Sequence, residues 1–383
     1  MVASRPVFDP FDLAGALDPY PTYRVLRDVA PVFHNSSRGF WALSRFEDVR
    51  SASRDWGTFS NSEGVDLDEL GRRVFGPGDF LDMDPPDHDE LRAVVRGRFT
   101  PKAIASLEPM IRDRVSRLLG RLSSGDAVAQ LAWPLPIDVM CSIIGFPEAD
   151  RAWISRLYAS VMERAPGEDA IPREALKAAA ELRDYFVDTA HKRRRRPEAD
   201  VLTMISQSEL PDTTVAGMCF VVFSAGIDTV ASLLGSAILL LAEHPAARQL
   251  ALEQPNGLAI VIEEVLRYES PLQFNARTTN VEVAVGDEVI PAGERVLLLY
   301  GSANRDERRF EAAHEFDVTR EPKRHLAFGE GIHFCIGAPL ARLQTRIALE
   351  ELLSRFPRYE IGEPVERSPA YNMRSLSSLP ISV

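Results

Sequence analysis

Apolar side chains recur with helical spacing through most of the chain. Residues 104–122 and 173–191 carry apolar positions three or four residues apart, the spacing that lines one face of an α-helix. The pattern is helical from residue 87 to about residue 252, resumes at residue 258 and stops before Pro271. A last helix is predicted at residues 338–356. These segments predict a chain in which helix dominates.

Alternation of apolar and polar residues, which is typical of strands, is confined to two regions. Residues 32–36 and 39–44 predict a hairpin after a short helix at residues 20–29, and residues 277–300 alternate around glycine-containing turns. The chain has no internal repeat and no low-complexity linker. We therefore expect one domain, residues 1–383, mainly α with a smaller β-sheet built from both ends of the chain.

An almost unbroken apolar segment, residues 215–242, is long enough to cross a bilayer. Asp228 and Thr229 lie near its middle, and no basic flank marks one side of it. A helix that is apolar all round can equally be the central helix of a large protein. Residues 1–12 have neither an apolar run nor a basic start, which predicts no signal peptide and no anchor. We expect a buried helix and no membrane.

Composition narrows the class of protein further. The net charge of −12 argues against a protein that binds nucleic acid. The three cysteines lack the spacing of a disulfide framework, which indicates a reducing, cytoplasmic compartment. Of the 383 residues, 45% are hydrophobic, enough for a deep core.

The most distinctive chemistry lies around Cys335. Residues 328–337 read Phe-Gly-Glu-Gly-Ile-His-Phe-Cys-Ile-Gly, and Pro339 follows in the first turn of the last predicted helix. The free amides and the dipole at a helix N-terminus favour a thiolate over a thiol. A structural cysteine would leave the glycines unexplained, and Cys141 and Cys219 are too distant in sequence to complete a zinc site. The pattern predicts a thiolate that binds a metal.

This string resembles the haem-binding signature of the cytochrome P-450 family, Phe-Gly-x-Gly-x-His-x-Cys-x-Gly, at every fixed position. The resemblance covers nearly the whole chain. It implies the family's triangular-prism fold, with haem b between the helix of Thr229 and the helix that follows Cys335. It also implies that Cys335 is the axial ligand of the haem iron and that Phe328 and Gly337 contact the cofactor.

A second motif, residues 225–229, interrupts the apolar segment with Ala-Gly-Ile-Asp-Thr. A buried Asp228 needs a partner, because an unpaired buried carboxylate is costly. One interpretation is structural: an arginine pairs with Asp228, and Thr229 bonds back to the carbonyl of Ala225. The resemblance implies another, in which Asp228 and Thr229 are catalytic and relay protons to dioxygen, while Gly226 leaves room for O2.

Haem carries two propionates, and buried carboxylates need cations or hydrogen-bond donors. By resemblance, four residues match the family's propionate ligands. His88 and Arg92 lie four positions apart, on one face of a predicted helix. Arg277 belongs to the predicted sheet, and His333 belongs to the cysteine motif.

A third motif pairs Glu264 with Arg267 three positions later on one helix face. Such pairs usually lie on a surface. In the resembled family the pair is buried and joined by a later arginine, here best matched by Arg320. The implied role is structural: the three residues hold the segment that leads to the cysteine loop.

The resemblance implies a haem-thiolate monooxygenase that inserts one oxygen atom of O2 into a small apolar organic substrate by hydroxylation, epoxidation or dealkylation. The alternative is a haem-thiolate binding or sensor protein without turnover, which would not need a proton relay. The chain lacks a flavin motif and an iron–sulfur cysteine cluster. A separate ferredoxin with its reductase, or a flavodoxin, is therefore expected to dock behind Cys335, with Arg96, Arg98 and Arg342 as candidate contacts.

Pocket residues are expected from several separate segments. Leu272, Phe223 and Phe274 suggest an apolar lining. Arg72 and Arg73 could meet an acidic substrate, although a solvated loop accounts for them equally simply. The sequence does not identify the substrate beyond this.

Overall fold

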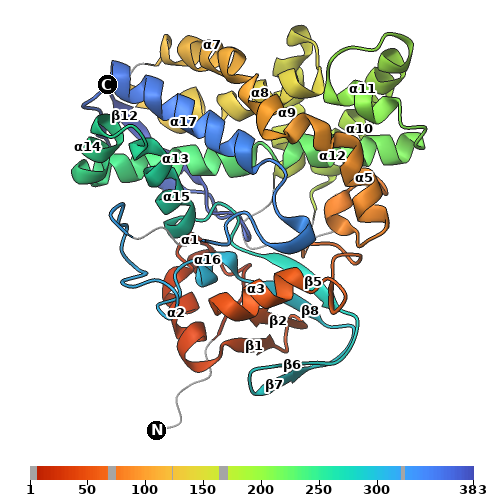
Figure 1. Ribbon diagram of the computed structural model, residues 1–383, viewed down its shortest axis with the longest axis vertical. Coiled ribbons are helices and arrows are strands. Elements are labelled where there is room, and N and C mark those ends of the chain that lie inside the picture. The colour runs from red at the N-terminus through yellow and green to blue at the C-terminus, as the bar shows by residue number, and fades with distance from the viewer. Residues whose placement is uncertain (1–6, 68–74, 123, 164–170, 321–323) are drawn as a thin grey trace.

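The computed structural model describes residues 7–67, 75–122, 124–163, 171–320 and 324–383. Helices fill one end of the molecule and a mixed sheet fills the other (Figure 1). The helical end contains α5 Asp87–Arg96, α6 Pro101–Ala105, α7 Glu108–Leu119, α8 Pro134–Ile144, α9 Arg151–Met162, α10 Arg173–Arg195, α11 Val201–Ser206, α12 Asp212–Ser224, α13 Asp228–Glu243, α14 Pro245–Glu253, α15 Gly257–Tyr268 and α17 Ala338–Arg355.

The main sheet has the strand order β1-β2-β8-β5-β3 and combines segments from both halves of the chain. β1 and β2 form the predicted antiparallel hairpin, β2 pairs with β8 in parallel, and β5 pairs with both β8 and β3 in antiparallel fashion. The strands are β1 Val32–Asn35, β2 Phe40–Leu43, β3 Phe59–Ser60, β5 Asn275–Thr279 and β8 Arg295–Leu298. Arg277 of β5 faces Val296 of β8 in the register, which fixes where its side chain leaves the sheet.

Short elements complete the architecture. The sheet end also carries α1 Leu13–Leu17, α2 Tyr20–Val29, α3 Phe46–Arg54 and α16 Tyr300–Ala303, together with the hairpin β6 Val283–Val285 and β7 Glu288–Ile290. Two small sheets use β4 Gly125–Asp126, β9 Glu360–Ile361, β10 Glu366–Arg367, β11 Leu376–Ser378 and β12 Pro380–Ser382. Single turns are η1 Phe80–Asp82, η2 Gly97–Phe99, η3 Val128–Ala132, η4 Glu148–Asp150 and η5 Gly331–His333.

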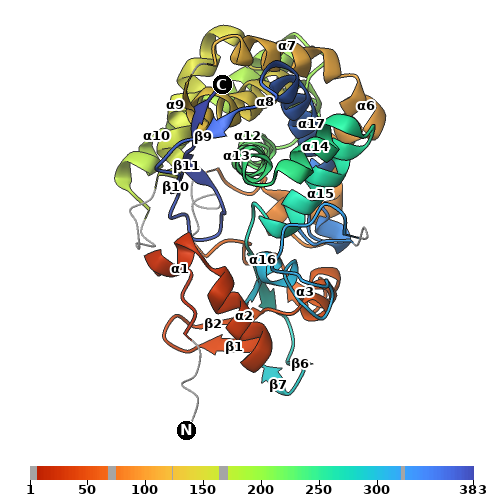
Figure 2. The ribbon, with the colours of Figure 1, turned by 90° about the vertical axis from the view of Figure 1, so that its left-hand side faces the viewer.

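The apolar segment is the central helix of the helical end, seen along its axis in Figure 2. Among the described residues, Asp212–Glu243 is the one helical stretch long and apolar enough to cross a membrane, yet 72% of its most apolar window is buried inside the protein. It packs against α8, α14, α15 and α17. The prediction of a buried helix is confirmed, with a turn at residues 225–227 that separates α12 from α13.

One predicted helix is divided in the structure. The periodic stretch at residues 104–122 forms α6 and α7, and Pro109 lies in the first turn of α7. Proline lacks the backbone N–H that a continuous helix would use at this position, so the chain ends one helix and begins another. The predicted helical pattern is confirmed here, and two helices carry it.

Buried apolar side chains form one large cluster in the helical end and two smaller ones around the sheet. Phe223 belongs to the large cluster and packs on Phe146, Tyr158 and Phe186. Phe274 lies in a cluster under the sheet. Both side chains are at most 2% exposed, so neither borders open space in the described structure, and their place in the substrate pocket stays a prediction. Arg72 and Arg73 lie outside the described residues.

Candidate active site

The cysteine motif forms a tight loop whose shape depends on glycine. The amide of Cys335 donates to the carbonyl of Phe328 at 2.9 Å, which closes the loop. Gly329 and Gly331 have φ values of 67° and 78°, the left-handed region that favours glycine. A Cβ on Gly331 would lie 2.6 Å from the carbonyl oxygen of Ser53 in α3. The predicted tight loop is present, and the surface against which it is pressed is the end of α3.

Burial and the helix N-terminus act in opposite directions on the pKa of the Cys335 thiol. The N–H groups of Gly337 and Ala338, at the start of α17, lower the pKa of this thiol, as do Arg92 and Arg342. Burial raises the pKa more strongly, so the net shift is upward. The helix N-terminus favours the thiolate, as predicted, but burial outweighs this effect. A metal cation bound to the sulfur would supply the missing stabilisation.

Four predicted propionate ligands meet beside the cysteine loop. The rings of His88 and His333 lie 4.4 Å apart, and Arg92 donates to the carbonyl of Phe334 at 2.5 Å. Burial, together with the charges of Arg277, His88 and Arg92, lowers the pKa of His333 to about 2. Three separate segments, α5, β5 and the cysteine loop, therefore bring these side chains to one place.

Several nitrogens in this cluster lack the partners that buried polar atoms need. Among the described residues, Nε2 of His88 and both ring nitrogens of His333 are buried without a hydrogen bond of good geometry. Such atoms are uncommon in folded proteins and need a partner, which can be a bound ligand or water. The carboxylates of an anionic group would pair with these nitrogens and with Arg92 and Arg277. The residues present therefore fit the propionates of haem b, and the thiol of Cys335 lies in the adjoining loop.

The acid and the alcohol of the central helix have different partners. Oδ2 of Asp228 accepts a hydrogen bond of 2.6 Å from the hydroxyl of Tyr158 in α9. The hydroxyl of Thr229 donates to the carbonyl of Ala225 at 2.9 Å. The structural interpretation predicted this bond from Thr229 to Ala225, and the bond is present. The same interpretation required an arginine beside Asp228, and no arginine of the described chain contacts Asp228. Burial raises the pKa of Asp228 to about 6, although the bond from Tyr158 opposes this.

Gly226 is explained by helix packing. A Cβ at this position would lie 2.6 Å from Sδ of Met140, which belongs to α8 and is buried. The missing side chain therefore allows α8 to approach the central helix closely. The role of Gly226 beside O2 stays a prediction.

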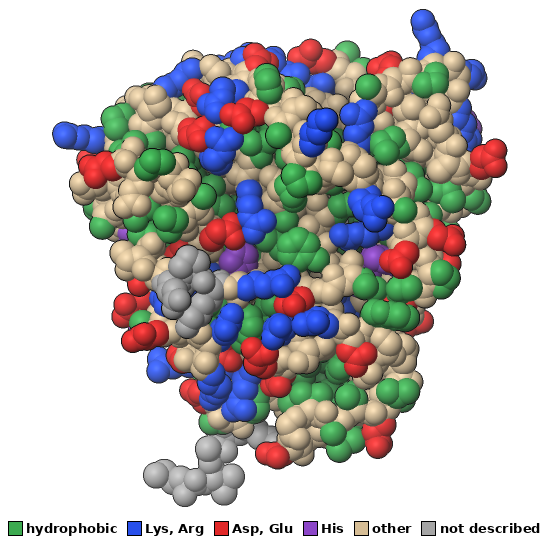
Figure 3. Space-filling view, viewed as in Figure 1, with side chains coloured by type: hydrophobic (Ala, Val, Ile, Leu, Met, Phe, Trp, Pro, Cys, Tyr) green, Lys and Arg blue, Asp and Glu red, His purple; other side chains and the backbone are tan. Residues whose placement is uncertain are grey.

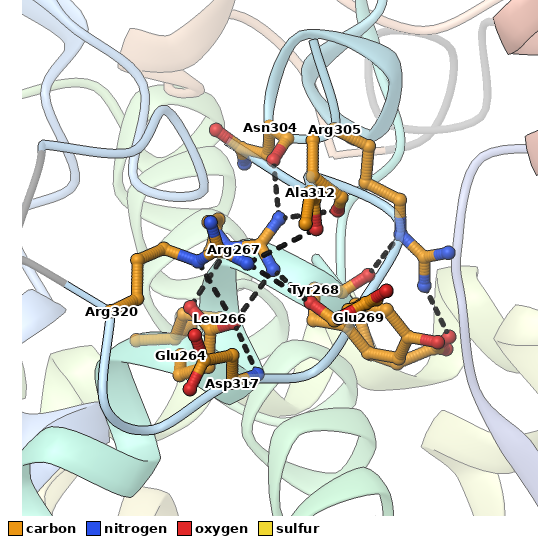
Figure 4. Close-up of polar contacts among 12 residues, drawn as sticks. Glu264, Leu266, Arg267, Tyr268, Glu269, Asn304, Arg305, Ala312, Asp317 and Arg320 are labelled. Atoms are coloured by element: carbon orange, nitrogen blue, oxygen red, sulfur yellow. Dashed lines mark hydrogen bonds and ion pairs between the residues drawn. The ribbon is translucent and has the colours of Figure 1, made fainter. Parts of the chain in front are cut away.

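The Glu264–Arg267 pair is buried, as the resemblance implied (Figure 4). Arg267 makes two hydrogen bonds to Glu264, at 2.6 and 2.8 Å. Its remaining donors reach the carbonyls of Asn304, Ala313 and Glu315, and Arg320 approaches Glu264 at 3.5 Å. One ion pair thus holds three positions of the segment between α16 and the cysteine loop.

The face that carries α3, α17 and the cysteine loop is rich in Lys and Arg side chains (Figure 3). Arg50, Arg54 and Arg324 surround Glu330 of the cysteine motif, with N–O distances of 3.3 to 3.6 Å. Sequence analysis missed these arginines, because only the fold brings α3 to the loop. Arg342, a predicted docking contact, instead pairs with Glu263 at 2.6 Å. Arg96 is exposed on the neighbouring α5, and Arg98 is partly exposed in the turn that follows.

Comparisons with known proteins show the family of the chain. The family model described as "Cytochrome P450" matches residues 257–379. The chain is 39% identical to cytochrome P450 130 of Mycobacterium tuberculosis over 369 residues, 90% of each chain. It is 34% identical to cytochrome P450 109 of Bacillus spizizenii over 385 residues, 96% of this chain and 92% of that protein.

Solved structures give the same result. P450BioI in complex with hexadec-9Z-enoic acid ligated acyl carrier protein superimposes with a TM-score of 0.89 at 30% identity, covering 97% of this chain and all of that one. CYP109E1 from Bacillus megaterium in complex with testosterone has a TM-score of 0.86 at 31% identity, covering 96% of this chain and 98% of that one.

The chain belongs to the cytochrome P450 family. It is a haem monooxygenase with haem b as its cofactor, and the predicted fold class is confirmed. The alternative of a sensor without turnover is not favoured by these relatives.

Proposed function

We propose that this protein inserts one oxygen atom of O2 into a small apolar organic molecule, with Cys335 as the axial ligand of the haem iron. The observation that carries the proposal is the group of unpaired nitrogens on His88 and His333, beside Arg92 and Arg277 and next to the cysteine loop. Haem b, when bound, supplies the redox chemistry that activates O2, and a thiolate ligand favours cleavage of the O–O bond.

The protein's own groups would bind, orient and supply protons. His88, His333, Arg92 and Arg277 would pair with the propionates, and Phe328 and Gly337 would contact the cofactor. Oδ1 of Asp228 would give up a proton while Oδ2 stays bonded to Tyr158. The hydroxyl of Thr229 would turn from the carbonyl of Ala225 to pass that proton on.

Spectroscopy tests the ligand. The reduced, CO-bound protein should show the strong red shift of thiolate ligation, and Cys335→Ala should lose it. Cys141→Ala is a matched control, because Cys141 is a buried cysteine in α8 whose pKa is raised by burial to about 12. An imidazole-type spectrum would overturn the assignment. Product formation coupled to NADPH use, measured with surrogate redox proteins, tests the reaction.

The proposed electron donor is a separate small acidic ferredoxin, with its reductase, or a flavodoxin. The basic face around the cysteine loop supports this, because complementary charge steers the encounter of two proteins. Arg54 and Arg324 are the best contacts, since 57% and 59% of their side chains are exposed. Their reversal to Glu should slow reduction of the iron and weaken its salt dependence. Arg183→Glu, on α10, is the control. Equal rates in all variants would place the docking site elsewhere.

The substrate is proposed as apolar, compact and neutral. Relatives have been solved with testosterone and with a fatty acid carried by acyl carrier protein, so a carrier-bound substrate is a second possibility for the same pocket. A ligand screen that follows the spin-state shift of the haem distinguishes free from carrier-bound ligands.

We further propose a cytoplasmic protein with one domain, residues 1–383, which the cysteine content and the acidic charge support.

A further inference from the structure

Tyr158 is the described side chain that binds the acid of the central helix. It lies in α9, is fully buried, and its hydroxyl is 2.6 Å from Oδ2 of Asp228. Its ring packs edge-on against Phe223 at a centroid distance of 5.3 Å and stacks on Trp133 at 6.2 Å. The ring is therefore fixed on two sides, and the hydroxyl has little freedom to leave the carboxyl.

Tyr158, the partner of Asp228, is uncharged, and this affects the protonation of Asp228. A carboxyl that faces an arginine or lysine stays ionised at neutral pH, because the opposite charge stabilises the anion. Within the described chain, the acid–tyrosine contact involves no cation: the pKa of Asp228 is raised by burial and opposed by the hydrogen bond from Tyr158. Asp228 is consequently able to hold a proton near neutral pH and to release it.

Charged groups on the neighbouring elements are occupied elsewhere. Asp138 of α8 pairs with Arg151 of α9 at 2.5 Å, and the pKa of Cys141 responds to these two groups. On α15, Glu263 and Glu264 pair with Arg342 of α17 and with Arg267. None of these described groups contributes to the pKa shift of Asp228. Tyr158 is thus the polar side chain that controls this acid.

We propose that Tyr158 is a positioning residue of the proton relay, holding Oδ2 of Asp228 and setting the pH at which Asp228 exchanges the proton that it passes on. The proposal rests on the proposed relay role of Asp228 and Thr229. In each cycle the Asp228 carboxyl gives one proton to the relay and becomes a carboxylate. The Tyr158 hydroxyl stabilises that carboxylate until a proton from the bulk solvent, carried by water, returns to Oδ1. No other bond is made or broken.

The direction of the effect follows from the hydrogen bond. Tyr158 donates to the charged form of Asp228 more strongly than to the neutral form, so the bond lowers the pKa of Asp228. Tyr158→Phe keeps the ring and removes this donor. The pKa of Asp228 should therefore rise by about one unit, since a hydrogen bond to a charged group is worth roughly tenfold or more in an equilibrium.

Infrared difference spectroscopy of the haem-loaded protein measures this directly. The C=O stretch of protonated Asp228, identified by its loss in Asp228→Asn, should titrate about one pH unit higher in Tyr158→Phe than in the natural protein. The pH profile of product formed per NADPH should move by the same amount, while the substrate-induced spin shift stays unchanged. Tyr185→Phe is the matched control, because Tyr185 also donates to an aspartate, Asp150, at 2.8 Å.

A second variant provides the test if Tyr158→Phe does not fold. Incorporation of 3-fluorotyrosine at position 158 keeps the shape and makes the hydroxyl a stronger donor, so the midpoint should move to lower pH. An Asp228 midpoint that moves in neither variant overturns the role of Tyr158. If the midpoint moves but Asp228→Asn leaves product per NADPH unchanged at every pH, the tyrosine–aspartate contact stands and the proposed relay is wrong.

Discussion

The guanidinium carbon of Arg342 lies 4.5 Å from the centroid of the Phe328 ring, and the same guanidinium makes two hydrogen bonds to Glu263. Phe328 opens the cysteine loop and accepts the Cys335 amide at its carbonyl. His325 joins the pair: its Nδ1 accepts from the amide of Ala327, which leaves Nε2–H to donate to Glu263. The Arg342–Glu263 pair, whose charges compensate each other, therefore lies on the ring that begins the loop of Cys335, the proposed iron ligand.

Opposite changes to this pair should shift the reduction potential of the haem iron in opposite directions. Arg342→Gln leaves the negative charge of Glu263 uncompensated, which stabilises the oxidised iron and lowers the potential. Glu263→Gln leaves the positive charge of Arg342 uncompensated, which raises the reduction potential. Each shift should be on the order of tens of millivolts, from the Coulomb energy of one charge at partly screened distance.

Redox titration of the four proteins, including the double variant, checks this pair. The double variant should lie near the natural protein, because both charges are removed. Arg346→Gln is the control: Arg346 is one turn further along α17 and pairs with Glu108 and Glu350 instead. Shifts of the same sign in both single variants would contradict an electrostatic cause.

Removal of one partner of the Glu264–Arg267 pair should cost far more stability than removal of a surface pair. Arg267→Ala leaves the Glu264 carboxylate buried and strips three backbone carbonyls of their donor, which should lower the free energy of unfolding by about 3–5 kcal/mol. Urea unfolding measures this. Arg117→Ala, which breaks an exposed pair with Asp113, should leave the midpoint unchanged. A small effect of Arg267→Ala would show that the pair is dispensable.

Gly331→Ala should damage the cysteine loop. The substitution places a Cβ 2.6 Å from the carbonyl oxygen of Ser53 at a φ of 78°. The left-handed conformation alone costs about 1–2 kcal/mol for a residue with a side chain. Gly293→Ala isolates that cost, because Gly293 has a φ of 83° with no atom within 4 Å of the new Cβ. Haem content after purification should fall in Gly331→Ala and stay normal in Gly293→Ala; equal haem content would mean that α3 yields to the loop.

Thr229→Ala tests the hydroxyl of the relay. The variant should keep haem, the spin shift and NADPH consumption, yet form less product per NADPH and release more peroxide, since one positioned donor is worth about 3–4 kcal/mol of barrier. Thr229→Ser should restore coupling. If the bond to Ala225 is the only role of this hydroxyl, coupling stays intact in Thr229→Ala and helix stability rises slightly.

Local patterns were sufficient for the elements and for the chemistry of the cysteine loop. The spacing of apolar residues predicted α2, the hairpin β1–β2 and α17 within a residue or two. The motif around Cys335 predicted a metal ligand, and the resemblance that it carried supplied the haem and the four propionate ligands. The predictions of these elements and of the cofactor are confirmed, because hydrophobic periodicity and glycine-dependent turns are properties of neighbouring residues. The iron ligand and the propionate ligands stay predictions.

Contacts between distant segments were decided by the tertiary structure. Arg50 and Arg54 meet Glu330 across some 280 positions, and Tyr158 meets Asp228 across 70. Residue types alone gave neither pair, because many arginines and tyrosines could have served. The tertiary structure also decided which residues are buried. Phe223 is a core residue, and burial raises the pKa of Cys335 although the amides at the helix N-terminus lower it. The sequence by itself determined the family, the cofactor and the cysteine motif, whereas the packing of α3 and α15 against that motif, and of α9 against Asp228, decided the charges and hydrogen bonds that act on these residues.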